Sequence, residues 1–252
     1  MKKLSLVFFA VLSSATLYGQ DTTVVQSSSI ASGFSSPTLS SKPTLSEVVA
    51  EFQSQSSQSV MGAAESMVSS KGDSAVDALV ELIDSDSIST SMQATDTGTA
   101  SVPFLQWKIM AISTLGEIGT PTAFSALLQV GYAPNRTELS GLTLQILTTT
   151  YYERVLKGDV APDSKVLGIL FSAADDPSYV WFLHKKVEDI AYLGLMNWLG
   201  MDFGEPQFRE ARLKAGGSSG ELSPEAYSQL WWKQNSANMV WNKETSHFEV
   251  GR

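Results

Sequence analysis

The sequence contains no cysteine and only two histidines. Without cysteine, a disulfide framework, a thiolate metal site and a cysteine nucleophile are all excluded. Zinc or iron sites need several convergent ligands, and a Ser-His-Asp triad needs a base that a carboxylate orients. His184 stands next to Lys185 and Lys186, which is typical of a solvated helix face, and His247 lies close to the C-terminus. We therefore expect no catalytic residue, no metal site and no cofactor.

Charged residues are also scarce, at 17% of the chain, and the acidic ones predominate, which gives a formal net charge of −9. An anionic surface repels phosphate backbones, which argues against a nucleic acid partner. Anionic membrane surfaces are disfavoured for the same reason. The partners that fit this balance are basic ones, or neutral ones met on an apolar face.

No hydrophobic run reaches the ~20 residues that a membrane-spanning helix needs. The run Leu4–Leu12 follows Lys2 and Lys3 and precedes the small residues Ser13, Ser14, Ala15 and Gly19. This is the pattern of a secretory signal peptide. We expect residues 1–19 to be removed and the mature protein to be exported, to the periplasm or outside the cell, without membrane insertion.

Composition divides the rest of the chain into three parts. Residues 20–43 are rich in Ser and Thr without a period and predict a linker. Residues 44–214 predict a helical repeat domain, in which the polar stretch 84–100 is an inserted loop. Residues 215–252 begin with a Gly-rich break and end in an aromatic segment. The predicted helices cover 44–53, 56–69, 73–83, 107–118, 121–131, 138–157, 162–174, 177–200 and 206–213, and another begins near Pro224.

The stretch Trp107–Gly131 predicts two amphipathic helices joined by a tight turn. Its apolar residues recur at helical spacing, so each helix has one stripe to bury. Gly119 supplies left-handed backbone geometry at the end of the first helix. Thr120 then caps the second helix, and Pro121 suits its first position, where a missing N–H costs nothing.

This unit has a copy upstream: residues 67–80 align without gaps on residues 115–128, an offset of 48 residues. A weaker trace begins at Leu199, which lies 84 residues after Leu115, about two repeats of ~42 residues. The unit resembles the HEAT repeat family, carried by Ala111, Leu115, Gly116, Ile118, Gly119, Pro121, Ala123 and Leu127. The resemblance implies an all-α fold, a short α-solenoid of HEAT-like helical hairpins. A generic helical bundle would share these residues, and the repeat spacing favours the solenoid.

The C-terminal segment is rich in large aromatic residues: Trp231, Trp232, Trp241 and Phe248. The last repeat of a solenoid needs a cap over its exposed apolar face, and these rings would supply one. Trp231, Trp232 and Trp241 are also our candidate partner-binding residues, either as anchors for a protein or as platforms for a sugar. The stretch 242–245 predicts a turn between two short strands.

Three carboxylate pairs were considered as catalytic groups: Asp84/Asp86, Asp175/Asp176 and Glu188/Asp189. Glycoside hydrolysis needs two carboxylates that face each other across a cleft, and nothing in the sequence places these so. Asp175-Asp176-Pro177 is better interpreted as the N-cap of the helix 177–200. The leading hypothesis is a non-catalytic protein–protein interaction or scaffold module. The alternatives are envelope glycan binding through the Trp-rich tail and, behind it, an enzyme with a carboxylate site.

Overall fold

The computed structural model describes residues 42–54, 60–85, 104–201 and 224–251. These residues are mostly helical, so the predicted all-α class is confirmed. The helices are α1 (Leu45–Ser54), α2 (Val60–Ser70), α3 (Val76–Asp84), α5 (Phe104–Ile118), α6 (Pro121–Val130), α7 (Thr137–Ile146), α8 (Tyr152–Lys157), α9 (Lys165–Ala173), α10 (Val187–Leu199) and α12 (Pro224–Asn235). Short 3₁₀ turns are η3 (Gly72–Ala75) and η6 (Ser236–Asn238), and η4 (Leu147–Tyr151) is a π-helical segment.

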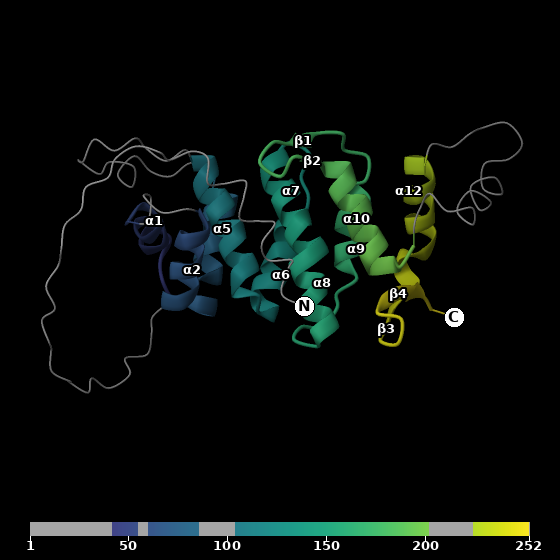
Figure 1. Ribbon diagram of the computed structural model, residues 1–252, viewed down its shortest axis with the longest axis horizontal. Coiled ribbons are helices and arrows are strands. Elements are labelled where there is room, and N and C mark those ends of the chain that lie inside the picture. Colours follow the sequence, from purple (N-terminus) through teal and green to yellow (C-terminus); the bar gives the residue numbers. More distant parts are fainter. Residues whose placement is uncertain (1–41, 55–59, 86–103, 202–223, 252) are drawn as a thin grey trace, which may run out of the picture.

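The helices pack in two rows. Helices α2, α5, α7 and α10 each contact the next along one row, and α3, α6, α9 and α12 do the same along the other. Figure 1 shows the resulting elongated arrangement, which runs from α1 at one end to α12 and the last strands at the other. In this part of the chain no helix is both long enough and apolar enough to cross a membrane.

A glycine with positive φ lies within two residues of the end of each of the helices α2, α5, α8 and α10. These glycines are Gly72, Gly119, Gly158 and Gly200, with φ of 52°, 63°, 79° and 62°. The intervals from each to the next are 47, 39 and 42 residues. Such backbone geometry favours glycine, which ends a helix without the steric penalty of a side chain. The solenoid of HEAT-like hairpins nevertheless stays a prediction.

The turn predicted at residues 119–121 forms as expected. The Thr120 hydroxyl accepts a hydrogen bond from the Ala123 N–H (3.2 Å), and Pro121 is the first residue of α6. The same hydroxyl donates to the Asp73 carboxylate (2.5 Å), 47 residues upstream. The two turns that the sequence alignment pairs therefore touch each other. The aligned apolar residues Met67 and Leu115, and Leu79 and Leu127, are all fully buried.

The capping box at the start of α1 is also confirmed. The Thr44 N–H donates to the Glu47 carboxylate (2.7 Å), and the Glu47 N–H donates weakly to the Thr44 hydroxyl (3.4 Å). These reciprocal bonds satisfy two backbone donors that a helix start leaves free. They also hold down the pKa of Glu47, since the largest cause is the hydrogen bond from the Thr44 backbone.

The prediction of one helix over 177–200 is wrong in its first half. Residues 179–186 form a hairpin of β1 (Tyr179–Val180) and β2 (Lys185–Lys186), and α10 begins only at Val187. The N-cap role predicted for Asp175-Asp176-Pro177 is wrong as well. The Asp176 carboxylate instead accepts from the Ser178 N–H and the Tyr132 hydroxyl, both at 2.9 Å, and its carbonyl accepts from the Glu188 N–H at the base of the hairpin. The aromatic and β-branched residues here favour extended backbone.

The predicted helix 138–157 is continuous through α7, η4 and α8, with its π-helical segment in the β-prone Thr run. Side chains of α10 bond to carbonyls of this segment: the Trp198 indole N–H donates to Leu147 (3.2 Å) and the Asn197 amide to Thr148 (3.1 Å). A π segment disturbs the regular bonding of a helix and leaves carbonyls in need of partners. These bonds fix α10 against η4.

Several sequence predictions lie outside the described residues. They are the signal peptide at 1–19, the linker up to residue 41, the loop from 86 to 100, the helix 206–213 and the Gly-rich break at 215–220. Among the described residues, the predicted C-terminal hairpin is present. Strand β3 (Met239–Asn242) pairs antiparallel with β4 (His247–Val250) around the turn at 243–246.

Candidate functional site

Two of the candidate tryptophans pack on the second row of helices. Helix α12 lies against α9, and the Trp232 ring stacks on Phe171 with ring centroids 5.0 Å apart and an interplanar angle of 16°. Trp231 contacts the same ring at 5.8 Å, and the Gln229 amide donates to the Phe171 carbonyl. Both tryptophans are half-buried. Their main contacts are therefore with the fold itself.

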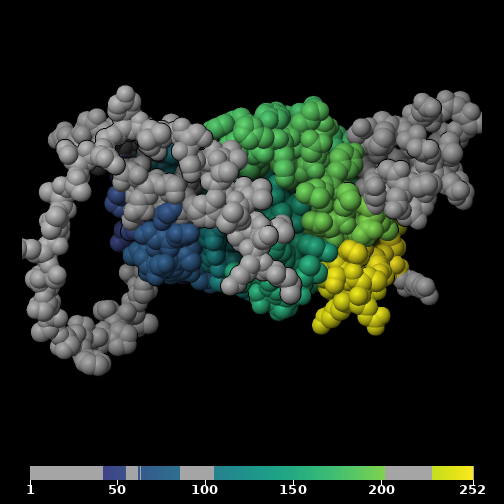
Figure 2. Space-filling model, viewed as in Figure 1, coloured from purple at the N-terminus to yellow at the C-terminus, as the bar shows by residue number. Residues whose placement is uncertain are grey.

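The third candidate, Trp241, belongs to another aromatic cluster at the same end of the molecule. Its centre is the fully buried Trp198, which contacts Trp241 and Phe248, each with centroids 5.9 Å apart. Trp241 and Phe248 face each other across the β3–β4 pair at 5.2 Å. Tyr151 and Tyr152 complete the cluster on the side of the helices. Figure 2 shows the C-terminal residues (yellow) seated against the end of the helical rows.

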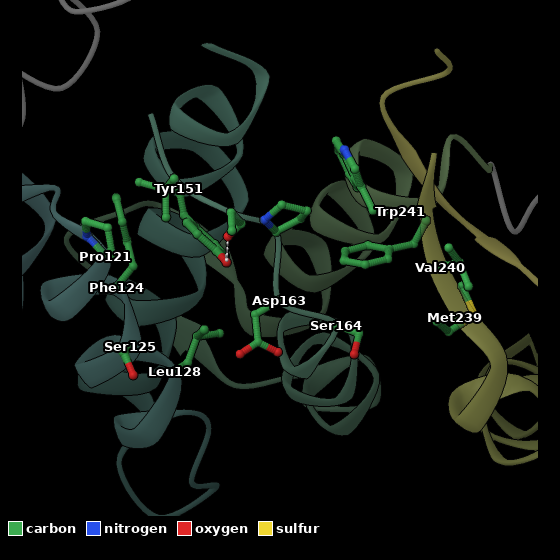
Figure 3. Close-up of a pocket in the computed structure, with 14 residues that line it drawn as sticks. Pro121, Phe124, Ser125, Leu128, Tyr151, Asp163, Ser164, Met239, Val240 and Trp241 are labelled. Carbon is green, nitrogen blue, oxygen red and sulfur yellow. Dashed lines mark hydrogen bonds between the residues drawn. The ribbon is translucent and has the colours of Figure 1, made fainter. Parts of the chain in front are cut away.

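A cleft of about 570 Å³ opens where the final hairpin meets the helices. Figure 3 shows its walls: Phe124 and Leu128 of α6 on one side, β3 with Trp241 on the other, and Asp163 between Leu128 and Ser164. The volume lies within the ~300–1,000 Å³ range of small-ligand pockets. The residues that line it are Pro121, Phe124, Ser125, Leu128, Tyr151, Val160, Ala161, Pro162, Asp163, Ser164, Met239, Val240, Trp241 and Phe248.

The polar groups of the cleft are few and mostly engaged. The Tyr151 hydroxyl donates to the Ala161 carbonyl (3.0 Å), and burial raises the pKa of Tyr151 to about 12, so it stays neutral. The Asp163 Oδ1 accepts from the Lys165 N–H (2.9 Å) at the start of α9. Asp163 is half-buried and is the one charged residue among those that line the cleft. The arrangement offers an apolar, aromatic surface with a single carboxylate.

One member of each candidate carboxylate pair, Asp176, Glu188 or Asp84, has a structural partner, and Asp86 lies outside the described residues. Asp176 is buried, and burial raises its pKa, but the hydrogen bonds from Ser178 and Tyr132 outweigh burial, so the pKa is lowered overall. Glu188 pairs with Lys186 at 2.8 Å, and Asp84 lies 3.9 Å from Arg136. Within the described ranges, no group of three or more His, Asp or Glu side chains is placed to hold a metal ion.

The two histidines lie in different places. His184 sits at the turn of the β1–β2 hairpin with φ of 52°, not on the helix that the sequence predicted. His247 starts β4 and packs over Gly200 at the end of α10, where a methyl group on Gly200 would lie 2.5 Å from its Nδ1. Neither histidine lines the cleft.

Of the residues that line the cleft, the sequence predicted Trp241 as a binding residue and Phe248 as part of an aromatic cap, and it indicated no binding role for the others. Phe124 and Tyr151 look like ordinary core residues of a helix, and Asp163, just before the N-cap residue Ser164, accepts the backbone N–H of Lys165 at the start of α9. The structure brings these distant segments together only because the hairpin folds back on α10. Also unpredicted are two exposed aromatic residues on the β1–β2 hairpin, Tyr179 and Trp181, with 54% and 59% of their surface accessible.

Comparison of the chain with family models, with curated proteins and with solved structures found no match. The candidate site therefore stands on its own geometry.

Proposed function

We propose that this protein is an exported, non-catalytic binding module that holds a protein partner in the cleft between α6, the 160–164 segment and the β3–β4 hairpin. The observation that carries the proposal is the lining of that cleft, which combines four aromatic rings with aliphatic side chains and one carboxylate. Tryptophan and tyrosine in well-packed pockets supply much of the binding energy of protein interfaces. A ring such as Trp241, half-buried at the rim of a cleft, suits that role.

The arrangement of helices supports a scaffold of HEAT-like hairpins. Two rows of sequentially packed helices with glycine turns at intervals of 47, 39 and 42 residues are the features that a repeat array of ~40-residue hairpins requires. Stacked hairpins present extended surfaces to which other proteins bind. Export is proposed on the N-terminal sequence pattern, which would place the partner in the cell envelope or outside the cell.

Two features of the cleft favour binding over hydrolysis. Acid–base hydrolysis of a glycosidic bond uses a pair of carboxylates, and the residues lining the cleft include one, Asp163. That carboxylate already accepts a backbone hydrogen bond from Lys165, which fixes its orientation.

Site-specific photo-crosslinking tests the proposal. A photoreactive residue at Ser125, which lines the cleft, is compared with one at Thr122, which is exposed on the same helix but does not line it. In cells of the source organism, we expect a discrete protein adduct from position 125 and a much weaker one from 122. Trp241→Ala should abolish the adduct, whereas Trp181→Ala, which removes an exposed tryptophan elsewhere, should leave it unchanged. Equal adducts from both positions, or none, would show the proposal to be wrong.

Glycan binding is the second candidate, and the position of Trp241 at the cleft favours it specifically. Pull-down with purified cell-wall polysaccharide separates the two. Retention on polysaccharide that is lost with Trp241→Ala, together with no protein adduct at position 125, would replace the protein partner with a glycan. Trp231→Ala serves as a comparison, because Trp231 packs on Phe171 and not at the cleft.

A further inference from the structure

The strand β3 borders the cleft along its edge. Met239, Val240 and Trp241 are consecutive, and all three line the cleft. Successive side chains of a strand point to opposite faces, so three in a row at one cleft means that the backbone of β3, and not only one of its faces, borders it. The face that carries Trp241 meets the cleft as well, because its cross-strand partner Phe248 is also part of the lining. On its other side β3 pairs with β4, which packs against α10.

The register of the hairpin shows which backbone groups of β3 face the cleft. The Gly251 N–H donates to the Asn238 carbonyl (2.7 Å), so these residues form a hydrogen-bonded pair. In an antiparallel ladder hydrogen-bonded and non-hydrogen-bonded pairs alternate. Val240 and Asn242 therefore turn their backbone groups toward β4, and Met239 and Trp241 turn theirs outward. In the described part of the chain this sheet has two strands, so no third strand meets those outward groups.

Charge gives the second constraint on the occupant. Asp163 is the charged residue of the lining, and its Oδ1 is used by the Lys165 N–H. The described residues provide no hydrogen-bond partner for its Oδ2. The whole chain carries a formal net charge of −9. A cationic side chain complements this site, and the rings of Tyr151 and Trp241 are surfaces on which such a cation is also stabilised.

We propose that the cleft binds an extended segment of a partner protein, which adds a strand to β3 through Met239 and Trp241 and places a lysine or arginine side chain against Asp163. This inference rests on the proposed function and specifies the partner segment. Strand addition gives affinity through main-chain hydrogen bonds, and the pocket selects the side chain. An exposed strand edge is a ready template for such pairing.

Short peptides test the selection of a cation. The probe is the blocked pentapeptide Thr-Val-Lys-Val-Thr, whose alternating β-branched residues favour extended backbone. Replacing its lysine with norleucine keeps the aliphatic stem and removes the charge, and we expect binding to fall roughly tenfold. A glutamate peptide should bind more weakly still. In the Asp163→Asn variant, which keeps an oxygen to accept from Lys165, the lysine and norleucine peptides should bind equally.

Amide hydrogen exchange tests the strand pairing residue by residue. Saturation with the lysine peptide should slow exchange of the Met239 and Trp241 amides. The Val250 amide, which points outward from the opposite edge of the hairpin and belongs to a residue that does not line the cleft, should not change and serves as the internal control. Methylating the peptide backbone at one set of alternate residues should abolish binding, and methylating the other set should spare it.

The outcomes separate this inference from the proposed function. A protein adduct at position 125, with no binding of the lysine peptide or no change at Met239 and Trp241, would overturn strand addition and leave the binding function standing. Peptide binding without preference for lysine would overturn the role of Asp163. Absence of both the adduct and peptide binding would overturn both proposals.

Discussion

The two ends of the helical array close their cores with different residues. Around α2, α3, α5 and α6 the fully buried side chains are mainly aliphatic, as with Leu79, Leu115 and Leu127. Near the C-terminal end of α10 the core adds an aromatic cluster, in which Trp198 contacts four other rings. A hairpin inside an array is covered by a neighbour of its own kind, whereas the last one must be covered by something else. Here large rings from β3 and β4 pack on Trp198 of α10, and the cleft lies where this hairpin meets α6 and the 160–164 segment.

The largest loss of stability should come from Trp198→Ala. Trp198 is fully buried, contacts four rings and donates a hydrogen bond to Leu147, so its removal leaves a large cavity and an unpaired carbonyl. We expect a loss of about 3–5 kcal/mol in the free energy of unfolding, measured by urea denaturation. Leu115→Ala, the matched change in the aliphatic half, should cost about 2–5 kcal/mol.

The two variants should differ in whether the β3–β4 hairpin is locally destabilised. In Trp198→Ala the amides of β3 and β4 should exchange faster than in the wild type under native conditions, because the hairpin loses its main support. In Leu115→Ala the hairpin should exchange at its wild-type rate, since α7 and α10 lie between α5 and the hairpin. Equal loosening of the hairpin in both variants would mean that the aromatic end is not a separate cap.

The next contrast concerns two buried glycines. A methyl group on Gly194 of α10 would lie 2.6 Å from Leu170 Cδ2 and from Thr148 Oγ1, so both neighbours must move. We expect Gly194→Ala to lose about 1–3 kcal/mol through overpacking. On Gly116 of α5 the nearest atom is Ile146 Cδ1 at 3.0 Å, the end of a flexible side chain. Alanine there gains helix propensity, and Gly116→Ala should be nearly neutral in the same unfolding assay.

A smaller effect is expected at the turn between α5 and α6. Thr120→Ala removes the N-cap bond to Ala123 and the contact with Asp73, and should cost about 1 kcal/mol. Thr120→Ser keeps the hydroxyl and serves as the control, with stability close to that of the wild type. Thermal unfolding measures both. Loss of stability in the serine variant as well would show that the methyl group, and not the cap, matters.

The aliphatic half was largely predictable from the sequence because its signals are local. Thr44 and Glu47 form a capping box within four residues, and Thr120-Pro121 marks a helix start without reference to the rest of the chain. Gly158 also has a positive φ at a helix end, and the sequence does not single it out because the residues after it lack the Thr-Pro pair.

The aromatic half was predictable in its composition but not in its geometry. Nothing in the sequence distinguishes the rings of Trp231, Trp232 and Trp241. In the structure Trp231 and Trp232 pack against α9, whereas Trp241 packs against α10 and lines the cleft. The hairpin at 179–186 was predicted as helix because its apolar residues also fit a helical period. Long-range hydrogen bonds, such as that from Tyr132 to Asp176 over 44 residues, favour the hairpin over the helix, and no local sequence pattern indicates them.

The smallest expected effect is on the pH dependence of stability, and it compares one carboxylate from each half of the molecule, Glu47 and Asp176. The pKa of both Glu47 and Asp176 is lowered on folding. A lowered folded pKa stabilises the protein above the unfolded value, here 4.5 for Glu47 and 3.8 for Asp176, and that stabilisation is lost as pH falls through the folded pKa. The Glu47→Gln and Tyr132→Phe variants should therefore have a lower free energy of unfolding than the wild type at neutral pH. The difference should disappear in acid, as measured by urea denaturation at a series of pH values.

Salt should affect the two carboxylates differently. Because Glu47 is exposed, the coulombic part of its contribution to stability should weaken in high salt. The buried Asp176, held by hydrogen bonds from Tyr132 and Ser178, should respond less. A Tyr132→Phe curve parallel to that of the wild type down to the lowest pH would mean that this hydrogen bond does not lower the pKa of Asp176.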